Sequence, residues 1–361
     1  MKRIFNFSAG PAILPVPVLE EASRGVLEIA NSGMSILEVS HRGAEYEAIH
    51  FDAKERLLRV LGLSPDEYTA LFLGGGASLQ FAMLPMNFLR TGQTADYVNT
   101  GEWAVKAIKE AKRFGSVNVA GSSEEGRFSY IPRDLSLTPG ARYVHITTNN
   151  TIEGTEYASL PETGAVPLIA DASSDIFAKA IDYSRFDLIY AGAQKNAGPA
   201  GVTLVIARKA FMDQAADDVP VILSYKTHVK ADSLYNTPPA FGVYVVGLVL
   251  KWIEDQGGLS VIESRNREKA DTVYRTLDEY PKVYDPAVTV REDRSLMNVT
   301  FRLRNADLDK EFLAGAKERG MDGLKGHRSV GGFRASIYNA FPLEGCQALA
   351  SYLHEFADGH P

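Results

Sequence analysis

The chain has 361 residues, of which 45% are hydrophobic and 23% are charged, and its formal net charge at pH 7 is −7. This length predicts two domains, and the acidic balance argues against a nucleic-acid partner or an acidic membrane surface. The single cysteine, Cys346, excludes an intrachain disulfide and a cysteine-rich metal site, so we expect a reducing compartment and no metal.

The amino-terminal stretch contains no apolar run of the kind that marks a signal peptide. The longest apolar run, Phe241 to Leu250, is about half of a membrane span. We therefore expect a cytoplasmic protein that has no membrane partner.

Residues 1–15 contain two prolines, Pro11 and Pro15, and predict an irregular N-terminal arm. From residue 16 to residue 257, helical and extended patterns alternate, which predicts an α/β fold with a mostly parallel sheet covered on both faces. The predicted helices are Val18–Asn31, Ala44–Leu61, Leu79–Leu89, Glu102–Phe114 and Phe241–Gln256, and the predicted strands are Tyr68–Leu73, Thr94–Asn99, Val117–Ala120, Tyr143–Thr148, Val166–Ala170, Phe186–Ala191 and Val202–Ala207.

The pattern changes at Gly257-Gly258, where we place a domain boundary. Residues 258–361 predict a smaller C-terminal α+β domain. Its predicted helices are Leu259–Tyr280, Leu308–Arg319 and Leu343–Ala357, and its predicted strands are Leu296–Arg304 and Phe333–Tyr338.

Two ionisable residues follow neighbouring predicted strands of the larger domain. Asp171 follows the run ending at Ala170, and a short helix is expected after it; Lys195 lies in the turn after Ala191. Catalytic groups of open α/β sheets gather where strands reach their carboxyl ends. A carboxylate and a lysine placed there could serve an aldehyde cofactor that forms a Schiff base. The alternative is a surface turn with a solvated lysine.

A glycine turn, Gly74 to Ser78, separates a predicted strand from a predicted helix. This arrangement points backbone N–H groups and the positive end of a helix dipole at an anion such as phosphate. It matches neither a dinucleotide fingerprint nor a Walker A loop, so the alternative is a plain connection.

Several longer motifs resemble those of the phosphoserine aminotransferase family. They are Phe5-Asn6-Phe7-Ser8-Ala9-Gly10-Pro11, Glu38-Val39-Ser40-His41-Arg42-Gly43, Ala191-Gly192-Ala193-Gln194-Lys195-Asn196-Ala197-Gly198-Pro199-Ala200-Gly201, Asn236-Thr237-Pro238-Pro239, Lys325-Gly326-His327-Arg328 and Arg334-Ala335-Ser336-Ile337-Tyr338-Asn339-Ala340. The resemblance implies the fold-type-I aminotransferase architecture, in which a seven-stranded, mostly parallel sheet forms a large domain that binds pyridoxal 5'-phosphate.

The same resemblance implies how the cofactor is held. Lys195 would form the Schiff base and move the proton, and Asp171 would pair with the pyridine nitrogen, although Asp171 could instead cap a helix. Trp103, otherwise a core residue, would stack on the ring. The remaining implied contacts are Thr151 to the phenolic oxygen, and Ala77, Ser78, Gln194, Asn236 and Thr237 to the phosphate. Because Asn236 and Thr237 belong to the partner subunit in this family, a homodimer is implied.

The implied reaction is ping-pong transfer of the amino group from L-glutamate to 3-phosphohydroxypyruvate, giving O-phospho-L-serine and 2-oxoglutarate in serine biosynthesis. Arg334 would bind the substrate α-carboxylate. A cluster of cationic or ionisable side chains would bind the distal anion; its members are His41, Arg42, His327 and Arg328. Some family members place an arginine in the glycine turn, where this chain has Ala77-Ser78. This departure bears on substrate preference.

Four other functions stay open at this stage. The family also acts on a phosphorylated hydroxythreonine intermediate of pyridoxine synthesis. An alanine–glyoxylate-type aminotransferase would need no distal-anion cluster. A cysteine desulfurase would need a nucleophilic cysteine on a mobile loop, whereas Cys346 lies in the first turns of the last predicted helix, so the sequence does not favour this alternative. A non-catalytic nucleotide-binding or scaffold protein would be colourless.

Overall fold

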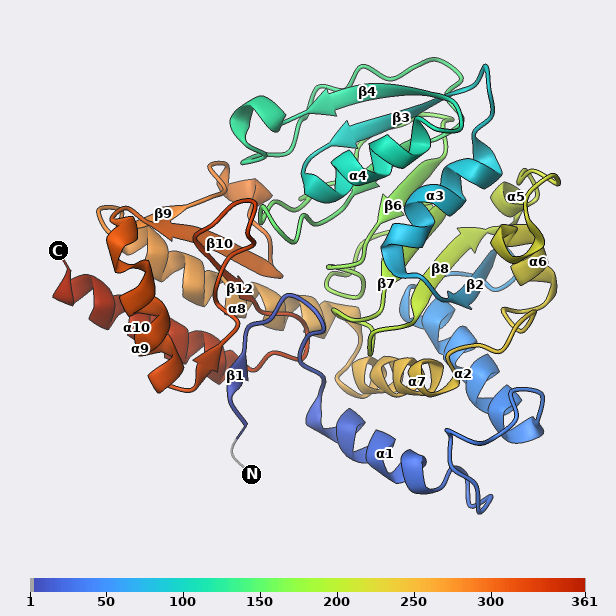
Figure 1. Ribbon diagram of the computed structural model, residues 1–361, viewed down its shortest axis with the longest axis horizontal. Helices are drawn as coiled ribbons and strands as arrows, with labels where there is room; N and C mark the ends of the chain where they lie inside the picture. Colours follow the sequence, from blue (N-terminus) through green and yellow to red (C-terminus); the bar gives the residue numbers. More distant parts are fainter. Residues whose placement is uncertain (1–2, 361) are drawn as a thin grey trace.

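A computed structural model describes residues 3–360. The first two residues of the predicted N-terminal arm and the last residue of the predicted C-terminal domain, residue 361, lie outside them. Figure 1 shows a large part built around a sheet and a smaller part that contains the C-terminal helices. Among residues 3–360, no helix is long and apolar enough to cross a membrane.

The large part contains a seven-stranded sheet in the order β2-β8-β7-β6-β5-β3-β4. Its strands are β2 (Tyr68–Leu73), β3 (Thr94–Asn99), β4 (Ser116–Ser122), β5 (Val144–Thr147), β6 (Leu168–Asp171), β7 (Leu188–Gly192) and β8 (Thr203–Arg208). Only β8 runs against its neighbours, pairing antiparallel with β2 and β7, whereas β3 to β7 pair in parallel. The predicted, mostly parallel α/β sheet is confirmed.

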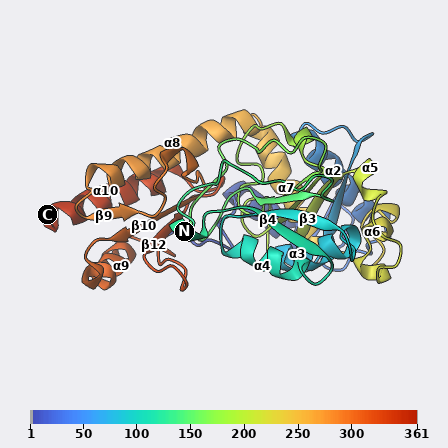
Figure 2. The ribbon, with the colours of Figure 1, turned by 90° about the horizontal axis from the view of Figure 1, so that it is seen from above.

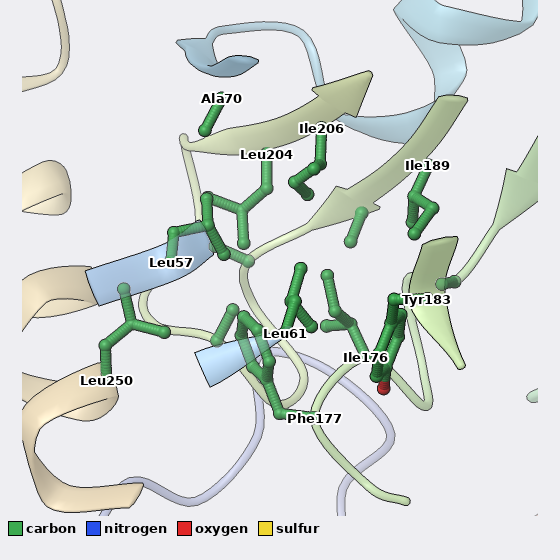
Figure 3. Packing of buried hydrophobic residues seen from close by; sticks show 14 of the residues in the cluster. Leu57, Leu61, Ala70, Ile176, Phe177, Tyr183, Ile189, Leu204, Ile206 and Leu250 are labelled. Atoms are coloured by element: carbon green, nitrogen blue, oxygen red, sulfur yellow. The ribbon is translucent and has the colours of Figure 1, made fainter. Parts of the chain in front are cut away.

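Helices cover both faces of this sheet. They are α1 (Val16–Leu27), α2 (Ala44–Val60), α3 (Gly76–Phe88), α4 (Glu102–Ala111), α5 (Lys209–Met212), α6 (Tyr225–Lys230) and α7 (Ala240–Asp255). Alternate residues of β2 point to opposite faces: Leu71 packs with α3 and α4, and Phe72 packs with α2 and α7. Figure 3 shows the second of these layers, where Leu57 and Leu250 belong to the same hydrophobic cluster as Leu204. Coverage on both faces explains why β2, β6 and β7 are buried along their whole length.

The smaller part has its own three-stranded antiparallel sheet, in the order β12-β10-β9. Its elements are α8 (Leu259–Glu279), β9 (Tyr284–Pro286), β10 (Asn298–Leu303), α9 (Asp309–Glu318), β11 (Met321–Asp322), β12 (Phe333–Ser336) and α10 (Leu343–Gly359). In Figure 2, α8 extends from the large part along the smaller one. We propose that the chain divides at Gly257-Gly258, where α7 ends and α8 begins.

The N-terminal arm packs mainly on this smaller part. Strand β1 (Phe5–Asn6) pairs in parallel with β11, and Phe7 is buried in the same hydrophobic cluster as Phe301 and Phe333. Further along, the arm returns to the large part, where the backbone N–H of Ala12 donates to the backbone oxygen of Gln194 at 2.8 Å. The arm therefore joins both parts of the chain.

Two predicted helix boundaries and one predicted helix differ from the structure in ways that the backbone angles explain. Helix α1 ends at Leu27, because Glu28 is extended, and Ala30 and Asn31 beyond it adopt left-handed backbone angles, with φ of 50° and 54°. Helix α3 begins at Gly76, not Leu79, after Gly75 supplies a φ of 85°. The short helix expected after Asp171 is instead a series of turns, in which Phe177 has a φ of 64°.

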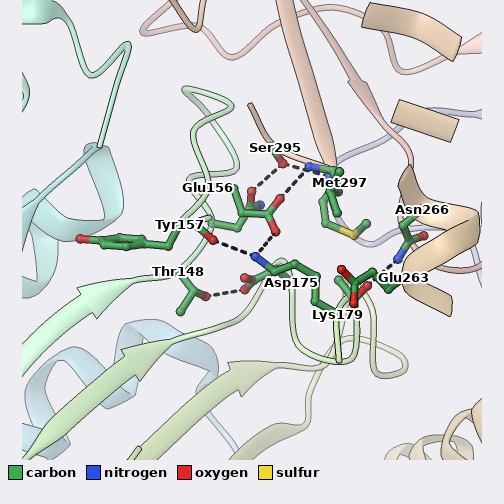
Figure 4. A network of polar contacts seen from close by, with 12 residues as sticks. Thr148, Glu156, Tyr157, Asp175, Lys179, Glu263, Asn266, Ser295 and Met297 are labelled. Carbon is green, nitrogen blue, oxygen red and sulfur yellow. Dashed lines mark hydrogen bonds and ion pairs between the residues drawn. The ribbon is translucent and has the colours of Figure 1, made fainter. Parts of the chain in front are cut away.

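A buried ionic network ties these turns to the smaller part, as Figure 4 shows. Lys179 pairs with Glu156 at 2.6 Å, and Glu156 also accepts the backbone N–H of Leu296 at 2.6 Å. Next to them, Asp175 accepts the Thr148 hydroxyl at 2.5 Å. The turn after β6 is therefore held at Lys179, through Glu156, and at Asp175, through Thr148.

Candidate active site

One cavity lies where the strands of the large sheet reach their carboxyl ends. It is lined by Gly76, Ala77, Ser78, Trp103, Thr147, Asn149, Thr151, Asp171, Ser173, Ser174, Gln194 and Lys195. The segments that follow β2, β3, β5, β6 and β7 all contribute to this lining. The parallel topology brings them to one edge of the sheet, because parallel strands end on the same side.

Lys195 projects into the cavity from the turn after β7. This turn is fixed by backbone hydrogen bonds from Ala193 to Val202 at 2.9 Å and from Gly198 to Ala193 at 2.8 Å. The Lys195 Nζ donates to Thr151 Oγ1 at 2.6 Å. Burial lowers the pKa of the Lys195 amine to about 8, although the charge of Asp171 opposes that shift. The amine is therefore uncharged for part of the time near neutral pH.

Asp171 ends β6 and is buried, with a side chain that is only 4% exposed. One carboxylate oxygen accepts the backbone N–H of Ser173 at 3.0 Å. Burial raises the pKa of Asp171, while the Ser173 contacts and the charge of Lys195 lower it. A cationic group next to this carboxylate would oppose the effect of burial in the same way.

Trp103 lies in the first turn of α4, on the side of the cavity facing Lys195. The Lys195 Nζ lies 5.9 Å from the centroid of the Trp103 ring. The indole also packs near Phe81 of α3, with ring centroids 6.4 Å apart. A flat ring entering the cavity would meet an aromatic face here.

The opposite end of the cavity is the start of α3. The first backbone N–H groups of a helix have no partner within the helix, and α3 presents those of Gly76, Ala77 and Ser78 here. Together with the helix dipole they suit an anion, and Gln194 lines the same end. The glycine turn is therefore the start of a helix that can bind phosphate.

The comparisons with known proteins agree with this geometry. Residues 4–349 match the family of class-V aminotransferases. The phosphoserine aminotransferase of Geobacillus kaustophilus is 55% identical over 358 residues, covering 99% of each chain. The chain belongs to the phosphoserine aminotransferase family.

Solved structures give the same result. The phosphoserine aminotransferase of Bacillus circulans subsp. alkalophilus superposes with a TM-score of 0.97 at 50% identity, covering 100% of both chains. A phosphoserine aminotransferase of Trichomonas vaginalis, solved with pyridoxal phosphate bound, has a TM-score of 0.89 at 38% identity and covers 98% of this chain and 100% of that one. The predicted fold-type-I architecture is confirmed, and the chain is a pyridoxal-phosphate-dependent aminotransferase.

The cavity fits this cofactor by the chemistry of its lining. Lys195 supplies a buried amine of lowered pKa for the aldehyde, and Asp171 supplies a buried carboxylate for the ring nitrogen. Thr151 supplies a hydroxyl beside the amine, and the start of α3 supplies N–H groups for the phosphate. Seven of the predicted cofactor residues line this one cavity; they are Ala77, Ser78, Trp103, Thr151, Asp171, Gln194 and Lys195.

The predicted substrate residues of the smaller part lie close by. Arg334 of β12 donates from Nη1 to the backbone oxygen of Thr151 at 3.2 Å. His327 and Arg328 belong to the loop before β12, and His327 bonds to the Ser329 hydroxyl at 2.7 Å. Burial lowers the pKa of His327, and the positive charges of Arg334 and Arg328 lower it further. The charges of Arg334 and Arg328 therefore act on His327, whose lowered pKa favours the neutral imidazole.

The other four predicted residues lie elsewhere in the single chain. His41 and Thr237 line a separate open cavity with Leu37 and Pro238, and Arg42 and Asn236 are exposed next to them in sequence. Within residues 3–360, neither Arg42 nor Arg328 has a salt-bridge partner. Their roles stay predictions.

The desulfurase alternative is wrong. Cys346 is fully buried in α10, and burial raises the pKa of its thiol to about 12, so it cannot act as a nucleophile on a mobile loop.

The sequence interpretation left other polar neighbours of the cavity without a role, among them Asn149, Ser173 and Glu153. Only their position beside Thr151 and Asp171 in the sequence could have indicated them.

Proposed function

We propose that this site transfers the amino group of L-glutamate to 3-phosphohydroxypyruvate, giving O-phospho-L-serine and 2-oxoglutarate. The observation that carries the proposal is the combination of a buried Lys195–Thr151–Asp171 group with a separate cationic group around Arg334. Ping-pong kinetics are expected, because both half-reactions use one site. When bound, pyridoxal phosphate supplies the aldehyde that carries the amino group and a ring that delocalises carbanion charge.

Lys195 is the proton carrier in this proposal. Its lowered pKa leaves part of the amine uncharged, so Nζ can accept the proton released from the substrate α-carbon. Thr151 Oγ1 accepts from the same nitrogen and fixes where it points. Lys195 would pass that proton to the cofactor carbon that takes up the amino group, and would carry a proton in the opposite direction when the amino group is delivered to the second substrate.

Asp171 and the start of α3 hold the two ends of the cofactor. The carboxylate of Asp171 keeps the ring nitrogen protonated, and burial strengthens that pairing because little water screens it. The N–H groups of Ala77 and Ser78, with Gln194, bind the phosphate. Trp103 covers one ring face.

Arg334 binds the α-carboxylate shared by both substrates, since a guanidinium can donate two parallel hydrogen bonds to it. His327 and Arg328, with His41 and Arg42, bind the distal anion, which is a carboxylate on one substrate and a phosphate on the other. A surplus of positive charge without internal ion pairs suits both anions.

We also infer a homodimer in which His41, Arg42, Asn236 and Thr237 complete the site of the partner subunit. An exposed apolar surface beside these residues supports it: Leu37 is 65% exposed and Tyr235 is 47% exposed. A cytoplasmic location is proposed as well, and the lone thiol of Cys346 is consistent with a reducing compartment.

Substrate choice tests the proposal. Purified protein supplied with pyridoxal phosphate should show a visible absorbance band that changes when glutamate is added. Turnover with 3-phosphohydroxypyruvate should exceed turnover with glyoxylate by about a hundredfold or more, because only the former uses the distal-anion cluster. Equal turnover would contradict the proposal, and a colourless protein would favour the scaffold alternative. The phosphorylated hydroxythreonine intermediate can be compared in the same assay.

Subunit mixing tests the shared site. Chains carrying Lys195→Ala and chains carrying Arg42→Ala are each expected to be nearly inactive. After unfolding and refolding together, a mixture should regain roughly a quarter of normal activity, because half of the random dimers then contain one intact site. If Arg42 serves its own subunit, no activity returns.

A further inference from the structure

Glu153 is a buried carboxyl group next to the proposed active site. It lies in the turn after β5, and its side chain is only 6% exposed. Its Oε1 accepts the backbone N–H of Glu102, the first residue of α4, at 2.8 Å. Its Oε2 is buried and has no hydrogen-bond partner among residues 3–360. Such an unpartnered buried oxygen is costly, so it requires an explanation.

The carboxyl group is packed tightly against the start of α4. A Cβ atom built on Gly101 would lie 2.6 Å from Oε2 of Glu153 and 2.9 Å from Oδ1 of Asn150. The absence of a side chain at Gly101 is what lets Glu153 reach the first N–H group of the helix. Trp103 follows immediately in the same helical turn, so Glu153 helps to set the position of the indole.

The same turn contacts the substrate arginine. Thr151, two residues before Glu153, accepts from Arg334 at 3.2 Å, and the Thr300 hydroxyl donates to the backbone oxygen of Glu153 at 2.7 Å. The Nε of Arg334 is also buried without a partner among residues 3–360. Glu153 and Arg334 do not form an ion pair, and each has one buried polar atom without a partner among residues 3–360.

Charges surround Glu153 on every side. Burial raises the pKa of its carboxyl group to about 7. The hydrogen bond from the Glu102 backbone and the charge of Arg334 oppose this rise, whereas the charge of Glu102 adds to it. Lys195 interacts with Glu153 across the main cavity. On the far side, Glu153 lines a second cavity whose other charged residues are Arg127, Arg302 and Asp285.

We propose that Glu153 is a positioning residue, whose carboxyl group fixes the start of α4 for Trp103 and leaves Arg334 free for a substrate carboxylate when it is protonated. The inference rests on the roles proposed above for Trp103 and Arg334. A charged Glu153 competes for the guanidinium and repels the substrate carboxylate. A neutral one does neither, and its Oε1 can still accept from Glu102.

Two ligands test the two parts of this inference. Pyridoxal phosphate is titrated into cofactor-free protein, and its dissociation constant reports the cavity itself. Glutarate, which has the carbon chain and both carboxylates of glutamate but no amino group, is tested as a competitive inhibitor of the loaded protein between pH 6 and pH 8.5.

Glu153→Ala should weaken pyridoxal phosphate binding by about tenfold, because the hydrogen bond to α4 is lost. Glu153→Gln should stay within about threefold of the original affinity, because its amide oxygen can accept the same N–H. In the unsubstituted protein, the inhibition constant of glutarate should rise by about tenfold above pH 7. Glu153→Gln should remove that rise, and Glu162→Gln, at an exposed carboxylate, should not.

Parallel pH profiles for the unsubstituted protein and Glu153→Gln would overturn the proposal, even if Glu153→Ala fails to fold. An unchanged cofactor affinity in a folded Glu153→Ala protein would overturn it as well. Arg334→Lys distinguishes a failure of the role proposed for Arg334 from a failure of the role proposed for Glu153. If it leaves the glutarate constant unchanged, the role proposed for Arg334 is wrong, whereas the cofactor affinity of Glu153→Ala still tests the contact with α4.

Discussion

The Nζ of Lys195 donates a 2.6 Å hydrogen bond to the hydroxyl of Thr151, whose backbone oxygen accepts one from Arg334. One residue therefore contacts the proposed proton carrier through its side chain and the proposed substrate arginine through its backbone. Substitution at position 151 can alter the first contact without removing the second.

Thr151→Val should lower kcat by about tenfold, because it removes one hydrogen bond from an ionisable amine in a buried site. The KM for glutamate should change little, since the backbone oxygen remains for Arg334. Steady-state kinetics with both substrates measure this difference. Thr151→Ser is the matched control and should retain most of the activity. A large rise in KM with unchanged kcat would contradict the assignment.

Lys195→Ala should abolish the visible band of the bound cofactor and lower kcat by about a thousandfold or more, because the side chain that moves the proton is gone. Lys209→Ala, at an exposed lysine in α5, serves as the control and should leave both unchanged. Absorbance spectra and kinetics are recorded on the same samples. Full transamination by the Lys195→Ala protein would show that the assignment is wrong.

The loading of pyridoxal phosphate into cofactor-free protein should depend on pH. The uncharged amine is the nucleophile, and burial lowers the pKa of Lys195 to about 8, so the loading rate should rise with pH and level off above that value. The negative charge of Asp171 raises the pKa of Lys195. Asp171→Asn should therefore move the midpoint to lower pH, as stopped-flow absorbance can measure. A midpoint near 10 in both proteins would indicate a solvated lysine.

The Lys179–Glu156 pair should contribute strongly to stability. Its side chains are 11% and 3% exposed, so Lys179→Met leaves a buried carboxylate unpaired and should cost about 3 kcal/mol of unfolding free energy. The exposed pair of Arg185 and Glu162 gives the control, because Arg185→Ala should cost less than about 1 kcal/mol. Urea denaturation followed by fluorescence compares them. Equal losses of unfolding free energy in the two variants would show that the buried ionic network adds little to stability.

The fold could be predicted from the sequence wherever a strand is buried on both faces. The runs ending at Ala170 and Ala191 are apolar apart from Asp187, so the strand ends that precede Asp171 and Lys195 could be located to within a residue or two. The start of α3 could not, because Gly75 and Gly76 appear as a flexible turn until the backbone angles are known. Local pattern identifies an element better than it fixes the boundary.

The part of the site that could not be predicted from the sequence depends on contacts between distant segments of the chain. The family motifs indicated Lys195 and Arg334 separately, but not that Thr151 joins them. Glu153 looks like an ordinary polar residue of a turn, and only the folded chain shows its carboxyl group against the start of α4. Its burial depends on Gly101, which lies 52 positions earlier, and no local pattern records such a pairing.

The pairing of β1 with β11 constrains the order in which a newly made chain can be completed. Synthesis proceeds from the amino end, so Phe5 leaves the ribosome long before its partner Met321 exists. Until then the arm cannot lie in its final place, where Gly10 packs against the aliphatic part of Lys195 and Ala12 bonds to Gln194. The first segment to be translated is thus among the last to dock, and its contacts with the turn that contains Gln194 and Lys195 form only after the C-terminal sequence has emerged.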